Sequence, residues 1–234
     1  MSSPARGVPP RGVPPRDIPP QGIPPHADQP VLGAGPDLDK ARAAMIMVHG
    51  RGASAEDILS LSDEFFDPSF AYVAPQAAGS VWYPRTFLSP IETNEPGITS
   101  GMSVLEGIES RLNEGGIPSE RIILLGFSQG ACLVLEYAAR HARRFGGVAG
   151  LSGGLIGPDG TPRDYAGSLA GTPVILGCSV TDPHIPRPRV ELTAKVLESL
   201  GAAVTLRLYP EPGHTVNEDE LALVRALVSS VSAG

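Results

Sequence analysis

The chain alternates continuous apolar segments with segments of helical spacing, and this alternation restricts its fold more than any other feature. Six apolar segments are predicted as strands, over residues 44–49, 70–74, 121–126, 146–151, 172–178 and 204–209. Helices are predicted over residues 54–62, 98–114, 129–141, 188–200 and 216–231. Strands that are apolar throughout are buried on both faces. We therefore expect an α/β fold, with a compact, mostly parallel sheet and helices on both faces.

The carboxyl ends of parallel strands meet at one edge of such a sheet, and binding sites form there. Residues 126–130 read Gly-Phe-Ser-Gln-Gly and lie between a predicted strand and a predicted helix. In this context the glycines permit a very tight turn that strains the central serine and exposes its hydroxyl. The pattern predicts Ser128 as a nucleophile; the alternative is an ordinary turn that happens to contain a serine.

A serine nucleophile needs a neutral imidazole as base and a carboxylate that orients the imidazole. Of the five histidines, His214 follows the last predicted strand in a glycine-containing loop at the expected edge. Asp182 follows the strand at 172–178, which gives the chain order serine, acid, histidine that this turn motif accompanies. Asp159 and Asp164 are alternative acids, although both precede that strand.

Residues 49–53 read His-Gly-Arg-Gly-Ala and follow the first predicted strand. This loop and the residue after the nucleophile usually supply the two amides that bind an oxyanion. We therefore expect the backbone N–H groups of Arg51 and Gln129 to form the oxyanion hole. His49 violates the expected order for a base, and we expect it to bond the backbone and hold the loop. The side chain of Arg51 could also contact an anionic substrate.

Aromatic residues are scarce in the chain, yet several gather in the long loop predicted over residues 75–97. At the active edge they could form the wall of an apolar pocket, or they could pin the loop to the body. The predicted substrate-binding residues are Trp82, Tyr83, Phe87, Ile185 and Val216, with Leu155 and Ile156 as further wall candidates. With no lid helix in the pattern, we expect a small-molecule ester with a short to medium acyl or an aryl group.

Residues 1–30 differ from the rest of the chain because they carry a five-residue repeat that ends in Pro-Pro. Paired prolines fix φ and remove amide donors, so this segment should form an extended, polyproline-like arm, followed by a catalytic domain at residues 31–234. The arm could bind a proline-recognition module or a second copy of the chain in a homodimer. The alternative is a solvated tail.

Composition narrows the partners and the compartment. The net charge of −7 argues against nucleic acid, which needs clustered Lys and Arg. No segment is long and apolar enough to span a membrane, and the N-terminus lacks the apolar part of a secretory signal, so we expect a cytoplasmic protein. The two cysteines, Cys132 and Cys178, lie in apolar segments and should be buried, reduced thiols. No histidine spacing supports a metal site, and we expect no cofactor.

Several of these segments together resemble the phospholipase/carboxylesterase family of α/β-hydrolases. The matching residues are Val48–Gly52, Ala74–Gln76, Trp82–Tyr83, Leu125–Ala131, Leu151–Gly154, Gly177–Asp182 and Tyr209–His214. The resemblance covers roughly residues 42–231 and implies an α/β-hydrolase fold, a Ser128–Asp182–His214 triad and oxyanion amides from Arg51 and Gln129. It implies a serine carboxylesterase; lysophospholipase and acyl-protein thioesterase activities are the alternatives within the family.

The chain departs from the family pattern at two places. Many members read His-Gly-Leu-Gly-Asp where this chain has His49-Gly-Arg-Gly-Ala53, and the segment around Asp182 is unusually rich in proline. Both changes would reshape the pocket. A dienelactone hydrolase is disfavoured because that chemistry uses cysteine at the position of Ser128. The remaining alternative of another class is a binding module that acts through its proline-rich arm.

Overall fold

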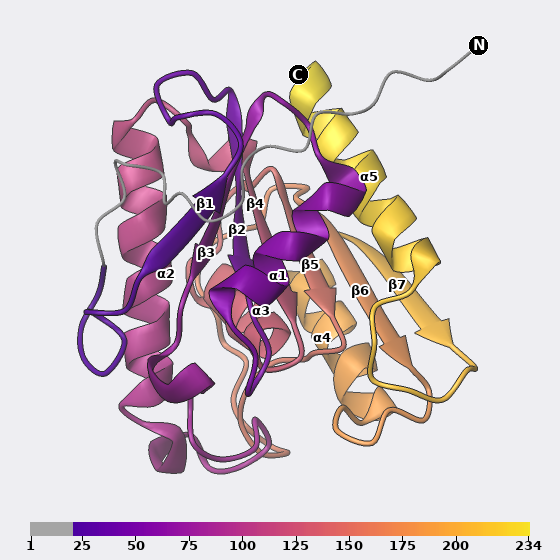
Figure 1. The fold of residues 1–234 in the computed structure, drawn as a ribbon. Coiled ribbons are helices and arrows are strands. Elements are labelled where there is room, and N and C mark those ends of the chain that lie inside the picture. Colours follow the sequence, from indigo (N-terminus) through magenta and orange to yellow (C-terminus); the bar gives the residue numbers. More distant parts are fainter. Residues whose placement is uncertain (1–20) are drawn as a thin grey trace.

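The computed structural model describes residues 21–234, in which one seven-stranded sheet lies between two layers of helices (Figure 1). The strands are β1 (Val31–Ala34), β2 (Ala43–Val48), β3 (Phe70–Pro75), β4 (Ile122–Phe127), β5 (Gly147–Leu151), β6 (Pro173–Ser179) and β7 (Ala203–Tyr209). The α-helices are α1 (Ala55–Ser60), α2 (Gly97–Glu114), α3 (Gln129–Arg140), α4 (Arg187–Ser199) and α5 (Glu218–Ala233). The predicted α/β class with a mostly parallel sheet is confirmed.

The strands lie in the order β1-β3-β2-β4-β5-β6-β7, and β2 to β7 are mutually parallel. The sequence pattern predicts these six strands but not β1, which pairs antiparallel with β3 at the edge of the sheet. β1 has only four residues, one of them Gly33, and its strand geometry comes from pairing with β3 rather than from its own pattern. The prediction of six strands was therefore one short.

Helices cover both faces of the sheet, with α1 and α5 on one face and α2, α3 and α4 on the other (Figure 1). Successive residues of β2 point to opposite faces: Ala44, Ile46 and Val48 pack with α2 to α4, whereas Ala43, Met45 and Met47 pack with α1 and α5. All six β2 residues are buried, which explains why the strand is apolar throughout. The same holds for β3.

Helix starts follow their capping residues. The side chain of Ser54 accepts a hydrogen bond from the backbone N–H of Asp57, as the sequence predicts, and this N-cap begins α1. α1 ends at Ser60 and continues as a 3-10 helix, so it is shorter than predicted. The last helix begins two residues later than predicted because Asn217 caps it, with Glu220 completing a capping box.

The predicted arm is described only from residue 21 onward; its first three repeats lie outside the described residues. Residues 21–30 form turns that pack against the domain, and His26 is buried. The hydroxyl of Ser100 in α2 donates to the carbonyl of Ile23 at 2.6 Å and accepts from the backbone N–H of His26 at 3.0 Å. This part of the arm is thus folded onto the body rather than extended from it.

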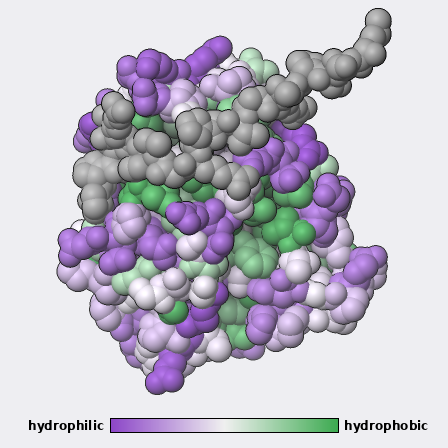
Figure 2. Space-filling view, viewed as in Figure 1, coloured by the Kyte–Doolittle hydropathy of each residue, from purple (hydrophilic) through white to green (hydrophobic). Residues whose placement is uncertain are grey.

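The surface that faces the viewer in Figure 2 is mixed, with hydrophobic residues near the middle and hydrophilic residues around them. Across residues 21–234, no helix combines the length and apolar character that crossing a membrane would need.

Candidate active site

Ser128 occupies the sharp turn between β4 and α3, with backbone angles φ 55° and ψ −117°. Positive φ is unfavourable for a residue with a side chain, so the turn is strained. A side chain at Gly126 would overlap the carbonyl of Gly130, and one at Gly130 would overlap the carbonyl of Val48. The two glycines therefore allow β4, the turn and the start of α3 to pack closely enough to present the serine hydroxyl.

The three residues predicted to act together do meet at the carboxyl edge of the sheet. The hydroxyl of Ser128 lies 2.7 Å from Nε2 of His214, and Nδ1 of His214 lies 2.7 Å from Oδ2 of Asp182. Asp182 follows β6 and His214 follows β7, two neighbouring parallel strands whose ends lie side by side. The imidazole can accept the serine proton at Nε2 while donating its Nδ1–H to the carboxylate.

The surroundings of Asp182 favour its ionised form. Its side chain is fully buried, and Oδ1 accepts backbone hydrogen bonds from His184 at 2.8 Å and Ile185 at 3.0 Å. Burial by itself would raise the pKa of this carboxyl, but the hydrogen bonds from His214, His184 and Ile185 outweigh it and hold the pKa below its ordinary value. Asp182 is thus a fixed negative charge behind the imidazole.

The other acids considered lie elsewhere. Asp159 pairs with Arg189 at 2.7 Å, and its side chain is solvent-exposed; Asp164 is exposed as well. Neither carboxylate contacts His214 among the described interactions. Asp182 is therefore the carboxylate that the fold brings to the imidazole.

The two amides predicted as oxyanion donors are available for a ligand. Within residues 21–234 the backbone N–H groups of Arg51 and Gln129 have no protein acceptor. Gln129 is the first residue of α3, where the positive end of the helix dipole favours negative charge. A Cβ added at Gly50 would lie only 3.3 Å from the Cβ of Ser128, so the loop that carries Arg51 lies beside the nucleophile.

His49 holds this loop, as the sequence analysis expected. The ring is fully buried, its Nε2 accepts from the backbone N–H of Ala77 at 3.1 Å, and its Nδ1–H donates to the carbonyl of Gly50 at 2.8 Å. Burial is the main effect on the ring and lowers the pKa of His49, so the imidazole is neutral, as these two bonds require. The structural interpretation of His49 is confirmed.

The side chain of Arg51 is engaged with the protein. Its guanidinium donates to the carbonyls of Tyr83 and Arg85, each at 2.7 Å, and of Pro84 at 3.2 Å. These bonds connect the oxyanion loop (residues 49–53) to the aromatic loop (residues 75–97). Arg51 also lines the cavity beside Ser128, so contact between its guanidinium and an anionic substrate stays a prediction.

The side chain of Gln129 makes a second connection to the aromatic loop. It is 6% exposed; its Oε1 accepts from the backbone N–H of Trp82 at 2.9 Å, and its Nε2 donates to the carbonyl of Tyr83 at 2.8 Å. Both residues that offer oxyanion amides are therefore held by the loop at residues 82–85.

A cavity of about 270 Å³ opens beside the serine. Its walls combine residues of the aromatic loop, the nucleophile turn and the two loops that carry Asp182 and His214: they are Arg51, Tyr83, Arg85, Thr86, Phe87, Ser128, Gln129, Cys132, His184, Ile185 and His214. Three of the five predicted substrate-binding residues line it, namely Tyr83, Phe87 and Ile185.

The other two predicted wall residues lie outside the cavity. Trp82 is fully buried beneath the loop and donates its indole N–H to the carbonyl of His49 at 3.0 Å. Val216 packs on the face covered by α1 and α5. Leu155 and Ile156 are buried in the core between the sheet and α2 to α4. Sequence proximity to the site did not determine which way these side chains point.

Several cavity residues were not predicted from the sequence to line the pocket, among them Cys132 and His184. Cys132 lies four residues after Ser128, one helical turn into α3, so helix geometry could have placed it on the nucleophile's side. His184 packs edge-on against His214, with ring centroids 4.9 Å apart. Burial raises the pKa of the Cys132 thiol to about 12, as it does for Cys178, so neither is a thiolate. Both cysteines are free and buried, as predicted.

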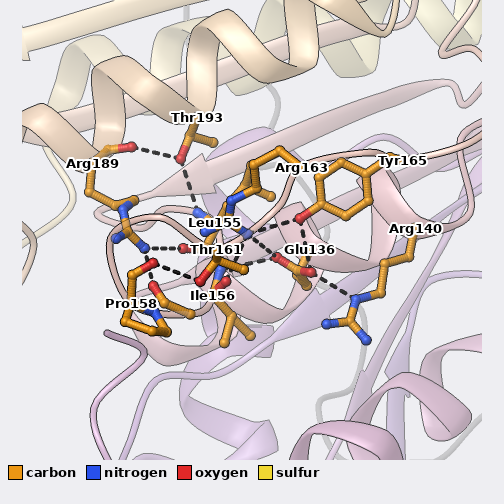
Figure 3. Close-up of polar contacts among 11 residues, drawn as sticks. Glu136, Arg140, Leu155, Ile156, Pro158, Thr161, Arg163, Tyr165, Arg189 and Thr193 are labelled. Carbon is orange, nitrogen blue, oxygen red and sulfur yellow. Dashed lines mark hydrogen bonds and ion pairs between the residues drawn. The ribbon is translucent and has the colours of Figure 1, made fainter. Parts of the chain in front are cut away.

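A polar network joins α3, the segment after β5 and α4 (Figure 3). Arg189 of α4 donates to the carbonyls of Leu155 and Gly157, at 2.9 and 2.5 Å, and its guanidinium lies 5.9 Å from the ring centroid of Phe87. The carboxylate of Glu136 in α3 accepts from the backbone N–H of Ile156 at 3.0 Å. These contacts fix the loop after β5 against the ring that forms one side of the cavity.

Within the described part of the chain, no group of three or more His, Cys, Asp and Glu side chains is arranged to hold a metal ion. The arrangement of a strained serine, an imidazole within hydrogen-bond distance, a buried carboxylate and two available amides is suited to acyl transfer.

Comparisons with known proteins agree with this site. Residues 36–232 match the family model described as phospholipase/carboxylesterase. The chain is 32% identical over 127 residues to acyl-protein thioesterase 1 of Gibberella zeae, a match that covers 52% of each chain and thus only about half of that relative. It is 29% identical over 215 residues to acyl-protein thioesterase 1 of Aspergillus fumigatus, covering 80% of this chain and 86% of that one.

A solved structure extends the match to the whole domain. The phospholipase/carboxylesterase from Dyadobacter fermentans superposes with a TM-score of 0.83 at 38% sequence identity, over 86% of this chain and 96% of that one. The family model covers most of the chain, and the fold agrees with that of a solved family member. The chain therefore belongs to the phospholipase/carboxylesterase family of α/β-hydrolases.

Proposed function

We propose that this chain is a serine carboxylesterase that hydrolyses short to medium acyl or aryl esters through an acyl-enzyme. One observation carries the proposal: His214 lies 2.7 Å from both the Ser128 hydroxyl and the Asp182 carboxylate, at the wall of a cavity. The family membership and the named relatives support the same chemistry.

Acylation begins when Oγ of Ser128 attacks the ester carbonyl carbon and its proton passes to Nε2 of His214. The carbonyl electron pair moves onto oxygen, and the amides of Arg51 and Gln129 stabilise that charge by about 3 kcal/mol for each donor. The bond from the carbonyl carbon to the alkoxide oxygen then breaks, and His214 donates its proton to that oxygen, so the leaving group departs as the alcohol. Asp182 stays ionised throughout and stabilises the imidazolium.

Deacylation repeats these steps with water as the nucleophile. His214 accepts a proton from water, whose oxygen attacks the acyl carbon, and the same two amides bind the oxyanion. When the tetrahedral intermediate collapses, the bond to Oγ breaks and His214 returns the proton to Ser128. The carboxylic acid leaves, and the enzyme regains its starting state.

The size and lining of the cavity support the proposed acyl range. About 270 Å³ is at the small end for ligand pockets in proteins. The apolar part of the lining comes from Tyr83, Phe87, Cys132 and Ile185, which suits a short hydrocarbon or an aryl ring. A panel of p-nitrophenyl esters from C2 to C12 measures this preference; we expect the highest kcat/KM at or below C8.

A thioester is the second candidate substrate, because two relatives are named acyl-protein thioesterase 1. The attack on the carbonyl is the same, and only the leaving group differs. Matched esters and thioesters with one acyl chain distinguish the candidates: an esterase should show the higher kcat/KM on the oxygen ester after correction for the uncatalysed rates. Lysophospholipid in the same panel tests the remaining family activity.

Labelling with a fluorophosphonate probe tests the nucleophile directly. We expect the wild-type chain to react and Ser128→Ala not to react. Cys132→Ala and Cys178→Ala are the matched controls, and both should keep the label because their thiols are protonated and buried. Label on Ser128→Ala, or none on the wild type, would overturn the proposed mechanism and favour a non-catalytic binding module.

Two further predictions concern the whole protein rather than the site. The sequence predicts a cytoplasmic location and a homodimer that uses the proline-rich arm, and both stay predictions. Light scattering coupled to size-exclusion chromatography measures the second.

A further inference from the structure

We infer that His26 is a positioning residue for the oxyanion hole, which it holds in place through Trp82. The inference rests on the proposed function, since it concerns the two amides assigned to oxyanion binding. It gives a function to residues 21–30, which the catalytic steps do not use.

His26 is embedded in the domain and bonded through both ring nitrogens. Its side chain is 2% exposed. Nδ1 lies 3.0 Å from the backbone nitrogen of Ala78, which donates to it, so Nε2 carries the ring proton and donates to the carbonyl of Trp82, also at 3.0 Å. Burial is the main effect on the ring and lowers the pKa of His26, which keeps it neutral as this pattern requires.

Trp82 connects His26 to both halves of the oxyanion hole. Its backbone N–H donates to Oε1 of Gln129 at 2.9 Å, and its indole N–H donates to the carbonyl of His49 at 3.0 Å. Its ring packs against both imidazoles, with centroids 5.1 Å from His26 and 5.2 Å from His49. The amide of Gln129 is one proposed donor, and His49 is two residues before Arg51, which supplies the other.

The anchor of His26 is itself rigid. Its backbone N–H donates to Ser100, which is fully buried in α2, and the hydroxyl of Ser100 donates in turn to the carbonyl of Ile23. Residues 21–30 therefore connect α2 to the aromatic loop. The series of contacts that holds Trp82 begins at a helix rather than at another loop. Oxyanion donors must be held in place before the charge develops, so support of this kind affects the transition state more than substrate binding.

His26→Ala tests the inference in the full chain. We expect kcat to fall by about 10- to 100-fold, with KM changed by less than about threefold, because displaced donors lose transition-state stabilisation. A trifluoromethyl ketone, which forms a hemiketal oxyanion on Ser128, should lose affinity by the same factor as kcat/KM. Ile23→Ser is the matched control in the same segment, because Ile23 is 45% exposed; it should leave all three values unchanged.

Two further variants separate positioning from a general structural role. His26→Gln should recover part of the loss, since its Nε2 can still donate to the carbonyl of Trp82. In a Gln129→Ala background, His26→Ala should cost much less than in the wild type, because both act through the same contact. Trp82 is the sole tryptophan of the chain, so its fluorescence emission reports the loop directly and should shift on His26→Ala but not on Ile23→Ser.

The outcomes distinguish this inference from the proposed function. An inactive wild type, or label retained on Ser128→Ala, contradicts the function. An active wild type with a folded His26→Ala of unchanged kcat and ketone affinity overturns the inference alone. If His26→Ala does not fold, Ser100→Ala replaces it: we expect about a threefold weaker ketone affinity there, and equal affinity would overturn the inference.

Discussion

The guanidinium of Arg51 forms three hydrogen bonds to carbonyl oxygens of residues 83–85, which makes its side chain part of the protein scaffold. The backbone N–H of Arg51 has a different role, as a proposed oxyanion donor. One residue thus links the aromatic loop to the oxyanion loop. Single substitutions at such positions should affect catalysis through geometry rather than through charge.

Arg51→Leu should lower kcat/KM by about tenfold for neutral and carboxylate-bearing esters alike, because it loosens a loop that both substrates need. The measurement is kcat/KM on an alkyl ester and on its ω-carboxylate analogue. Arg85→Leu is the control, since it also removes a cationic side chain from the cavity wall but leaves the carbonyl of residue 85 as an acceptor. A loss on Arg51→Leu confined to the carboxylate ester would support the anionic-substrate hypothesis.

Phe87→Ala should shift the acyl preference toward longer chains. Phe87 is 6% exposed and forms one wall of the cavity, so truncation lengthens the space for an acyl chain. The ratio of kcat/KM for C8 over C2 should rise about three- to tenfold, in line with the energy of a few methylene groups in an apolar pocket. Thr86→Ala serves as the neighbouring control, and an unchanged ratio in Phe87→Ala would place the chain elsewhere.

At the scale of elements, the ends of the parallel strands determine where the loops begin. The conformations of those loops then determine which side chains come into contact. β2 to β6 were predictable because each is apolar over most or all of its length, and the glycine-flanked turn before α3 is a local signal. β7 was predictable from alternation instead, since Val204, Leu206 and Leu208 alternate with more polar residues such as Thr205 and Arg207. β1 was not, since its strand geometry depends on pairing with β3. Trp82 and Tyr83 are adjacent in an irregular loop. Such a loop has no helical or strand periodicity, so the sequence could not predict which of the two side chains faces the cavity.

Helix α5 begins with a carboxyl group that is poorly solvated. Glu220 is 1% exposed and lies against Gly177 of β6, where a side chain would not fit. Burial raises the pKa of Glu220 from an ordinary 4.5 to about 7, and the nearby charge of Asp219 adds to the shift. The native state therefore holds a proton between pH 4.5 and 7 that the unfolded chain has released.

It follows that the contribution of Glu220 to stability should fall as pH rises from about 4.5 to about 7, by up to about 3 kcal/mol. Glu220→Gln removes the titration and can still complete the capping box, so its unfolding free energy relative to that of the wild type should rise between pH 5 and pH 8 and exceed the wild-type value at pH 8. Urea unfolding at pH 5 and pH 8 measures both. Glu218→Gln, at an exposed position of the same turn, should keep the wild-type slope.

At the scale of the whole molecule, one sheet edge collects residues that are far apart in sequence, from the oxyanion loop after β2 to His214 after β7. The sequence predicted this meeting because parallel strands align their carboxyl ends. It did not predict that His26 supports the site, because that contact joins residues 56 positions apart and depends on how the aromatic loop folds. Contacts between irregular segments leave no periodic trace in a sequence.

The positive φ of Ser128 sets thermodynamic stability against activity. A backbone held there costs of order 1–3 kcal/mol for any residue with a side chain, and glycine escapes most of that cost. Ser128→Gly should therefore melt a few degrees above Ser128→Ala, although neither can form an acyl-enzyme; equal melting temperatures would mean that the turn is relaxed. The fold would therefore have a higher free energy of unfolding with glycine in place of its nucleophile, and only selection for turnover would keep a side chain at this bend.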